Sequence, residues 1–362
     1  MLLQLQPRIQ RVLVHRTGHL GDTVCAIPAF RLLRRHFTDA ELVMLCDRPS
    51  KQKVAAWDVV TRLELFDRLI SYDSGKGWRT PLELFRLVRR LAPDVVVQLP
   101  QVDRTARSIA TQRFFFQLSG VRRLVGFRSW DCPQEWHPSE PHRLIRLLND
   151  EGIPGSKPRY GIPLDQGSLA SLREKLEDLD VDLEQPYLVF CGGGKTATQR
   201  WPLSRYAQVL SSIRRHCQLP VIAVGGPDEL TAYRREVLPV FPQLQIPRSG
   251  LLIIELVELL RFALAYLGND TGPMHLAAAV DCPVAAVMSA RNKPGAWDPD
   301  IARRLIIRHR TPCEGCRLSE CLVEQHRCMT AIDTQRVEGA VRGFVQELLT
   351  QRRSGVLPRT LL

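Results

Sequence analysis

Short apolar runs rich in β-branched residues alternate with helical stretches along the whole sequence, and few folds are compatible with this pattern. The runs are almost continuously apolar, as in Val95–Val97 and Val221–Val224. Such runs are typical of parallel strands in a sheet that helices cover on both faces. The alternation therefore predicts a doubly wound α/β fold. We expect strands at residues 11–16, 41–46, 69–72, 94–99 and 124–127, and a second series at 187–191, 221–224, 245–247, 265–268, 284–288 and 305–308.

Two series of strands in 362 residues indicate two domains, because a domain usually has about 100–200 residues. A Pro- and Gly-rich stretch and a polar helix separate the two series. We expect a first Rossmann-like domain over residues 1–167, a linker region over 168–186 and a second Rossmann-like domain over 187–333. Residues 334–362 are expected to form a C-terminal helix and a frayed tail. One option for this helix is to pack back onto the first domain.

The charge of the chain is unevenly distributed. Lys and Arg number 50 and Asp and Glu 38, a net charge of +12, and residues 1–165 contain 26 of the basic and 17 of the acidic side chains. The first half is therefore expected to face an anionic partner, such as a phosphorylated substrate, an acidic membrane surface or a nucleic acid. A basic surface without a dedicated partner is the alternative. The composition, 44% hydrophobic and 24% charged, excludes a wholly disordered or fibrous chain.

The sequence contains no pattern typical of a membrane span or a signal peptide. The most apolar helical stretch, Leu251–Leu267, has a charged residue at every third position from Glu255 to Arg261, as an amphipathic helix does. Proline and arginine interrupt the first eleven residues, where a signal peptide would be apolar. We therefore expect a cytoplasmic protein whose ten cysteines are mostly thiols rather than disulfides.

A glycine-containing turn follows the first expected strand, at residues 15–23. Ligands of open α/β sheets bind at the carboxyl ends of strands, so this turn is a candidate site. Asp22 falls in the first turn of the next helix, where the helix dipole favours a carboxylate. It is either an N-terminal cap or a general base that points into the cleft between the domains. The neighbouring acceptor-side candidates are Arg16, Gly18, His19 and Gly21.

A second glycine-rich loop, Gly192–Thr196, opens the second expected domain. It is not a Walker A motif, because Val189 stands where the first glycine is required, and it matches a dinucleotide fingerprint only weakly. The loop is rich in amide donors, which predicts a cradle for a diphosphate, or else a mobile surface loop. Its candidate donor-binding side chains are Lys195, Thr196 and Arg200.

The strand at 265–268 leads into a turn and a helix that begins with a proline, a residue pre-organised for a first helical position. The first amides of such a helix form an anion site, and a simple capping arrangement is the alternative. We expect Asp270 to organise the backbone, because its charge would repel phosphate. The donor-binding candidates are Asp270, Thr271, Gly272, Pro273, Met274 and His275.

Asp228 and Glu229 follow another expected strand of the second domain, after Gly225 and Gly226. A carboxylate at such a strand end often holds ribose hydroxyls. The equal alternative is an acidic turn at the start of a helix.

Four cysteines lie within 16 residues near the end of the second domain: Cys313, Cys316, Cys321 and Cys328, with His326 among them. In a cytoplasmic chain this clustering is compatible with a small structural site for zinc or iron. The spacing is not that of a common zinc finger. Reduced thiols without a ligand, or a redox-dependent disulfide loop, are the alternatives.

Three segments together resemble glycosyltransferase family 9, the lipopolysaccharide heptosyltransferase family. They are Val12–Phe37 with its Leu-Gly-Asp turn, Arg200–Ala207 with Arg-Trp-Pro, and Asn269–Ala279 with Asn-Asp-Thr-Gly-Pro-Met-His. They occur in the family's order, and the resemblance extends from about residue 9 to 335. The cysteine cluster also resembles one found in many members. One position departs from the pattern, because Gln199 stands where many members have lysine before Arg-Trp-Pro.

The resemblance implies a GT-B architecture, in which two Rossmann-like domains face a central cleft. It implies an inverting transfer of a heptose or related sugar from a nucleoside-diphosphate sugar, ADP-heptose in the best-known members, to a core-type acceptor of lipopolysaccharide. No cofactor and no catalytic metal would be required. Asp22 matches the family's proposed base, and Thr271, Gly272, Met274 and His275 match its diphosphate-contacting turn.

The implied partners are a nucleotide-sugar donor and an anionic glycolipid, met on the cytoplasmic face of the membrane. Other functions of the same fold remain as alternatives: transfer of a different sugar, a protein acceptor, or a catalytically silent member that binds a nucleotide sugar. A nucleic-acid-binding protein is disfavoured, because the sequence lacks a basic patch interleaved with aromatic residues.

Overall fold

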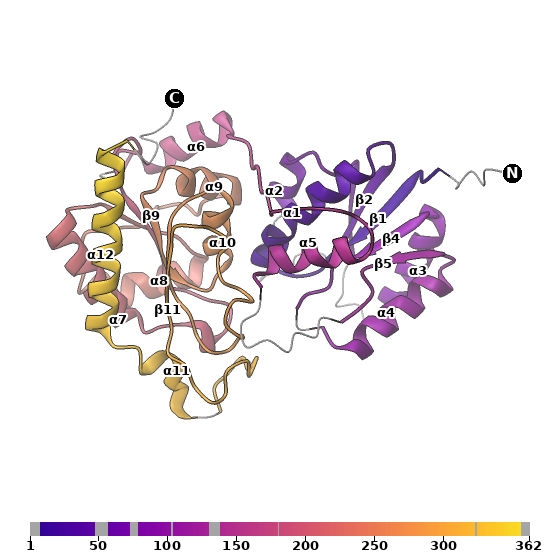
Figure 1. Ribbon diagram of the computed structural model, residues 1–362. Coiled ribbons are helices and arrows are strands. Elements are labelled where there is room, and N and C mark those ends of the chain that lie inside the picture. The colour runs from indigo at the N-terminus through magenta and orange to yellow at the C-terminus, as the bar shows by residue number, and fades with distance from the viewer. Residues whose placement is uncertain are drawn as a thin grey trace, which may run out of the picture. The chain divides into compact units, whose positions relative to one another are not determined.

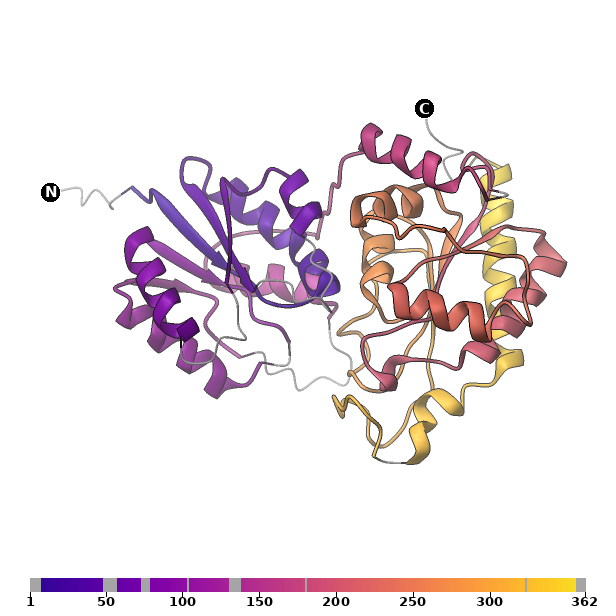
Figure 2. The same cartoon turned by 180° about the vertical axis from the view of Figure 1, so that it is seen from behind.

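The structure is a computed structural model that describes residues 8–47, 57–72, 79–102, 104–129, 138–179, 181–322 and 324–355. It divides into two compact units, the first ending at Tyr160 and the second beginning at Gly161. Each unit has one parallel sheet between layers of helices (Figures 1 and 2). The fold is thus the doubly wound α/β, two-domain Rossmann-like fold that the sequence predicts. Most of the expected frayed tail, residues 356–362, lies outside the described residues.

The first unit contains a five-stranded sheet with the order β3-β2-β1-β4-β5. All its strand pairs are parallel, and β1 lies at the centre with Val14 beside Met44 on one side and Val97 on the other. The strands are β1 (Arg11–His15), β2 (Glu41–Asp47), β3 (Arg68–Tyr72), β4 (Val95–Gln98) and β5 (Arg123–Val125). The helices are α1 (Leu20–His36), α2 (Trp57–Arg62), α3 (Arg79–Leu91), α4 (Ala106–Leu118) and α5 (Glu140–Asp150).

Consecutive residues of the central strands are buried, as a parallel sheet covered on both faces requires. Leu13, Val43 and Val96 belong to one apolar cluster, with side chains of α3 and α4 such as Val88 and Phe116. Helices α1 and α5 pack against each other. Because helices cover both faces of the sheet, side chains on either face of a strand are buried, and the runs therefore contain few polar positions.

The second unit contains a six-stranded parallel sheet with the order β11-β10-β9-β6-β7-β8. Its strands are β6 (Leu188–Cys191), β7 (Val221–Ala223), β8 (Leu244–Gln245), β9 (Ala265–Asn269), β10 (Val284–Val287) and β11 (Arg304–Ile307). Its helices are α6 (Gln166–Leu176), α7 (Leu203–Cys217), α8 (Pro227–Glu236), α9 (Ile253–Phe262), α10 (Gly272–Ala279), α11 (Arg327–Thr330) and α12 (Thr334–Arg353), with short 3-10 helices at Ala197–Gln199 and Glu324–His326.

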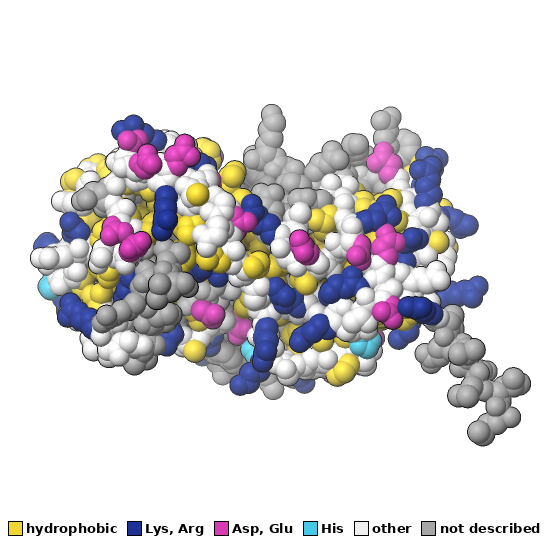
Figure 3. Space-filling model, turned by 90° about the horizontal axis from the view of Figure 1, so that it is seen from above, with side chains coloured by type: hydrophobic (Ala, Val, Ile, Leu, Met, Phe, Trp, Pro, Cys, Tyr) yellow, Lys and Arg dark blue, Asp and Glu magenta, His cyan; other side chains and the backbone are white. Residues whose placement is uncertain are grey.

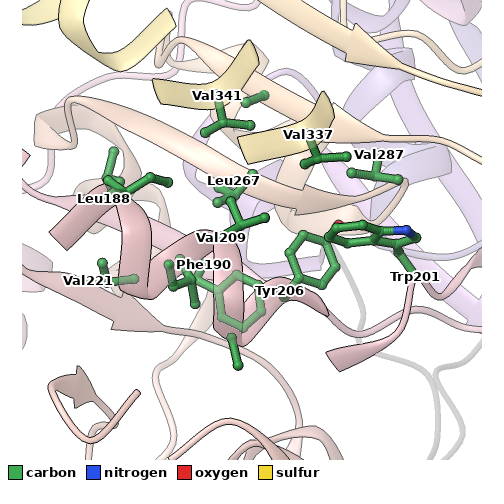
Figure 4. Packing of buried hydrophobic residues seen from close by; sticks show 14 of the residues in the cluster. Leu188, Phe190, Trp201, Tyr206, Val209, Val221, Leu267, Val287, Val337 and Val341 are labelled. Carbon is green, nitrogen blue, oxygen red and sulfur yellow. The ribbon is translucent and has the colours of Figure 1, made fainter. Parts of the chain in front are cut away.

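The last helix, α12, packs on the second unit, where it contacts α7 and β11. Figure 4 shows Val337 and Val341 of α12 in the same apolar cluster as Leu188 and Leu267 of the sheet. This placement differs from the option of a return to the first domain. The physical reason is an apolar stripe on α12, whose members recur at helical spacing and are buried against the second sheet: Val337, Val341, Val345 and Leu348.

The helix that the sequence analysis placed in a linker region, α6, is part of the second unit. It packs against α9, and its Lys175 ammonium lies 2.8 Å from the Glu255 carboxylate, while Ser171 donates a hydrogen bond to the same carboxylate. The boundary between the units therefore precedes α6. None of the helices in the described part of the chain is long and apolar enough to cross a bilayer.

Candidate functional site

Asp22 lies in the first turn of α1, directly after the turn that follows β1. One carboxylate oxygen, Oδ2, accepts a hydrogen bond from the backbone N–H of His19 at 2.7 Å. The other oxygen, Oδ1, accepts one from the side-chain amide of Gln101 at 2.7 Å. Asp22 is thus a helix cap and also a half-buried carboxylate at the carboxyl end of a central strand. This geometry confirms the capping interpretation, and the role of general base stays a prediction.

Gly18 is required for the approach of the turn to Asp22. Its φ is +136°, and a Cβ placed on it would lie 2.6 Å from the Cβ of Asp22. Any L-residue would be strained there and would also displace the carboxylate. The Gly18 amide donates a hydrogen bond to Asp47 at the end of β2. The turn is thus held by Asp47 after β2 and by Gln101 after β4.

Arg16 is buried and does not present its guanidinium to solvent. Its Nη2 lies 3.1 Å from Glu140 Oε1 and donates to the backbone carbonyl of Asp22 at 2.8 Å. Its Nη1 donates to the carbonyl of Leu99, which follows β4. Arg16 thus holds the Asp22 turn against the β4 loop, which is a positioning role rather than the acceptor contact expected from the sequence.

Glu140, at the start of α5, pairs with a second arginine as well. Arg143 Nε donates to Glu140 Oε2 at 2.6 Å, and Arg143 Nη2 donates to the carbonyl of Pro100. The side chains of Arg16, Glu140 and Arg143 are all at most 1% exposed. A buried carboxylate shared by two guanidinium groups is strongly oriented by its hydrogen bonds. Gln101, Glu140 and Arg143 were not predicted from the sequence, because they come from segments far from Asp22 in the chain.

In the second unit, a buried asparagine organises the predicted donor side. Asn269, the last residue of β9, donates two hydrogen bonds, to the carbonyls of Gly192 at 2.8 Å and Gly193 at 2.9 Å. Its side-chain oxygen accepts one from the Tyr206 hydroxyl at 2.8 Å and lies 3.3 Å from the Trp201 amide nitrogen. One side chain therefore fixes the glycine loop, the Arg-Trp-Pro segment and the end of β9 together. The sequence motif contained Asn269, but its role was not predicted.

The helix α10 begins where the sequence predicts, with Thr271 as its N-cap residue and Pro273 in its first turn. The first amides of a helix have no partner within the helix, so this end favours an anion. The Thr271 hydroxyl is 2.8 Å from the hydroxyl of Tyr266, and Met274 and His275 are buried.

Asp270, next to this helix start, is surrounded by hydrogen-bond donors. The His275 Nε2 atom lies 3.6 Å from its Oδ1, and the amides of Gln199 and Asn292 each donate to its Oδ2 at 3.3 Å. This arrangement fits the expected organising role of Asp270. It also places Gln199, the position that departs from the family pattern, in direct contact with the turn at 270.

Glu229 supports the glycine loop from α8. Its Oε1 accepts a hydrogen bond from the Gly194 amide at 2.9 Å and its Oε2 accepts one from the Gly226 amide at 2.8 Å. A Cβ on Gly193 would lie only 1.7 Å from Glu229 Oε1, so the loop needs glycine there. Both oxygens of Glu229 are thus engaged by the backbone, whereas Asp228 beside it is exposed.

Two cations flank this loop. The Arg200 Nε donates to the carbonyl of Gly194 at 2.9 Å, and both Arg200 and Lys195 are exposed. Thr196 is half-buried, and its hydroxyl donates to the side-chain oxygen of Gln199 at 3.0 Å. On the face that Figure 3 shows, Lys and Arg side chains lie among Asp and Glu side chains, so this face has no large patch of positive charge alone.

The cysteine cluster lies on the segment that supports the Gln199 region. The Thr198 hydroxyl donates to the carbonyl of Leu318 at 2.7 Å, and the His326 Nε2 atom lies 2.9 Å from the carbonyl of Thr198. Burial raises the pKa of the Cys328 thiol. Within the described residues no three His, Cys, Asp or Glu side chains form a group that could hold a metal ion. The predicted zinc or iron ligands are therefore not assembled as a ligand set.

This chain is similar to a known protein family and to a named heptosyltransferase. Residues 125–326 match the family model described as glycosyltransferase family 9 (heptosyltransferase). The lipooligosaccharide heptosyltransferase 2 of Campylobacter jejuni is 19% identical over 350 residues, which cover 90% of this chain and 96% of that protein.

Solved structures with a similar fold include a glycosyl transferase of family 9 from Veillonella parvula, with a TM-score of 0.69 and 18% identity over 93% of this chain and 98% of the other. The ADP-heptose LPS heptosyltransferase II of E. coli has a TM-score of 0.67 and 19% identity, covering 93% of this chain and 99% of the other. The iron-containing dodecameric glycosyltransferase TibC from enterotoxigenic E. coli has a TM-score of 0.54 and 14% identity, covering 94% of this chain and 77% of the other.

Proposed function

We infer the reaction from one premise: this chain belongs to glycosyltransferase family 9. The family model covers more than half of the chain, and the chain is therefore a glycosyltransferase. Its two parallel sheets are those of the GT-B heptosyltransferases with a similar fold. We propose that it transfers a heptose, or a related sugar, from a nucleoside-diphosphate sugar to a core-type acceptor of lipopolysaccharide, with inversion at the anomeric carbon.

The donor assignment depends most on one observation, the buried Asn269 that ties the glycine loop to the turn before α10. We propose that the first amides of α10 bind the diphosphate and that Lys195 and Arg200 neutralise its charge as it leaves. Fixed amide donors and cations then do what a metal ion does in other transferases. ADP-heptose is the proposed donor, because the relatives include proteins named as heptosyltransferases and one named for ADP-heptose.

We propose Asp22 as the general base that takes the proton from the attacking acceptor hydroxyl. Its two hydrogen bonds, from His19 and Gln101, orient the carboxylate before the acceptor arrives. The buried Arg16–Glu140 pair keeps the turn that carries Asp22 in place. The positive excess of the first half supports an anionic acceptor, met at the cytoplasmic face of the membrane.

The test is transfer by the purified protein. ADP-heptose and other nucleoside-diphosphate sugars are each offered with lipopolysaccharide that lacks heptose, and the products are identified by mass. We expect one heptosyl unit to be added, with an inverted anomeric configuration by NMR and with full activity in the presence of EDTA. Loss of activity with EDTA that Mg²⁺ restores would contradict the metal-independent mechanism.

The contact of Gln199 with Asp270 favours a second candidate, a donor other than ADP-heptose. A neutral amide replaces the lysine of many family members beside the diphosphate turn, so the site has one positive charge less. Transfer of a different sugar would support this candidate, whereas transfer to a protein would indicate a different acceptor. Binding of a nucleotide sugar without any turnover would indicate a catalytically silent member.

The four thiols do not enter the proposed reaction. They lie on the segment that contacts Thr198, so we propose that this cluster supports the donor loop. A structural zinc or iron ion is the alternative, and elemental analysis of protein purified without chelator tests it. About one metal ion per chain would require the thiols to form a ligand set that this arrangement lacks.

A further inference from the structure

Helix α4 has two large apolar side chains on its exposed face. Phe114 is 62% exposed and Leu118 is 56% exposed, and their spacing of four places them on the same face of the helix. On the opposite side of α4, Ile109 and Phe116 are buried in the core. The helix is therefore apolar on two sides, whereas packing within the first unit explains only one of them.

Exposed arginines lie on the same two helices, α3 and α4, and on the segment after α4. Among the described residues, Glu83 is the one exposed acidic side chain on the two helices, and none of these exposed arginines has an ion-pair partner within the described part of the chain. Arg89 stacks on the ring of Phe85. The exposed arginines are Arg86, Arg89, Arg90, Arg107, Arg113, Arg122 and Arg123.

The α3/α4 surface is defined by these arginines with Phe114 and Leu118, and its two helices cover one face of the first unit's sheet. Both helices pack on one face of the sheet and contact each other, and Figures 1 and 2 show them side by side. Helix α4 begins just after the loop of Gln101, which donates to Asp22. Phe114 and Leu118 lie in the last two turns of α4, toward the opposite edge of the sheet, so a bilayer bound there would lie along the helix rather than at the Asp22 turn.

We propose that the α3/α4 surface docks on an anionic lipid bilayer. The guanidinium groups would pair with lipid phosphates, for which their planar donor geometry is suited, while Phe114 and Leu118 enter the boundary between headgroups and acyl chains. A second copy of this chain fits less well, because a symmetric contact would place the same unpaired arginines opposite each other. This inference rests on the proposed function in one respect, namely that the acceptor is a glycolipid.

The test is co-sedimentation with vesicles. Wild-type protein is expected to bind vesicles of phosphatidylglycerol and phosphatidylcholine at least ten-fold more strongly than vesicles of phosphatidylcholine alone, and to be released by salt. The double variant Phe114→Ser/Leu118→Ser is expected to lose about ten-fold in binding. The matched control, Val240→Ser/Leu252→Ser, removes two exposed apolar side chains of the second unit and should bind as wild type does.

A second measurement tests the proposal in case the double variant Phe114→Ser/Leu118→Ser does not fold. The variant Phe114→Trp, with lipids brominated on their acyl chains, should show more fluorescence quenching than wild type. Any of three results would overturn the proposal. They are equal binding to neutral and anionic vesicles, unchanged binding of Phe114→Ser/Leu118→Ser, and no added quenching in Phe114→Trp. Self-association lost in the double variant would identify a second copy as the occupant and overturn it too, as would salt-dependent binding to DNA without binding to vesicles.

The experiment also separates this inference from the proposed reaction. With a water-soluble acceptor fragment, the double variant should retain wild-type turnover, and with acceptor embedded in vesicles it should be about ten-fold slower. A protein that binds vesicles through Phe114 but transfers no sugar would contradict the proposed function and leave the docking surface standing. A protein that transfers sugar equally to both acceptors and ignores vesicles would do the reverse.

Discussion

At the scale of single residues, Asp22 serves both local structure and the proposed chemistry. Its bond to the His19 amide could be expected from its place in the first helical turn, since short acidic side chains cap helices. The bond from Gln101 comes from a residue 79 positions away and depends on the neighbouring placement of β1 and β4. Both bonds hold the carboxylate in a single orientation.

The variant Asp22→Asn separates these two roles, because asparagine can still accept the hydrogen bond from the His19 amide but is not a base. We expect donor binding to be unchanged and kcat to fall by about 10²–10⁴-fold, the usual contribution of a general base. Donor titration and steady-state kinetics measure the two quantities. A variant with wild-type kcat would remove the base assignment.

His15, the last residue of β1, is a buried histidine with a strongly shifted pKa. Burial lowers its pKa from 6.5 to about 4, and the nearby charge of Arg104 acts in the same direction, while the hydrogen bond with Gln98 opposes it. Because the native state disfavours the proton, the unfolded chain binds it first as the pH falls.

This shift predicts a loss of stability as the pH falls from about 6.5 to about 4, of about 3 kcal/mol for a shift of this size. Urea unfolding of wild type and His15→Gln across this range measures it, and the variant should show a smaller dependence on pH. The exposed His36 serves as the control, since His36→Gln should follow wild type. An equal pH dependence in His15→Gln and wild type would show that other groups cause the loss.

At the scale of elements, a buried ion network joins the loop after β1, the loop after β4 and the start of α5. Replacing Glu140 with glutamine leaves Arg16 and Arg143 without their counter-charge in a dry environment. We expect Glu140→Gln to reduce the free energy of unfolding by about 3–5 kcal/mol. Denaturant unfolding checks this. The exposed pair of Arg248 and Asp178 is the control, because Asp178→Asn should cost less than about 1 kcal/mol.

Asn269 has the corresponding role in the second unit, where it joins β9, the glycine loop and the segment before α7. We expect Asn269→Ala to weaken donor binding by about 10–100-fold, because it removes two hydrogen bonds to the glycine loop, each contributing about 0.5–1.5 kcal/mol. Calorimetric titration with the nucleotide sugar measures the affinity. Tyr206→Phe removes one bond to Asn269 and leaves the loop bonds in place, so its affinity should stay near wild type. Equal losses in both variants would contradict the assigned role.

At the scale of the whole molecule, the helix α12 decides how far the second unit extends along the chain. Val341 of α12 is 1% exposed and packs in the core of the second sheet (Figure 4). We expect Val341→Ala to lower the free energy of unfolding by about 2 kcal/mol through lost burial and a cavity. Gln346 is exposed on the same helix, and Gln346→Ala should change it by less than about 0.5 kcal/mol. Equal effects of the two substitutions would argue against the packing of α12.

The fold class and most strands were predictable because buried parallel strands have a local signature. The predicted runs at 11–16 and 265–268 overlap β1 and β9 almost completely. Boundaries between units were less predictable, because they depend on which partner a helix finds. The polar helix α6 has the composition of a linker, and only its contact with α9 makes it part of the second unit.

The sequence by itself determined the alternation of strands and helices, the helix start at Thr271 and the placement of Asp22 in a first helical turn, because periodicity, proline and capping residues act over a few positions. Tertiary structure alone decided that Arg16 is buried, that Glu229 binds the glycine loop and that Gln101 reaches Asp22. These contacts join residues that lie far apart in the chain. Their existence depends on the order of strands in each sheet, which no local pattern encodes.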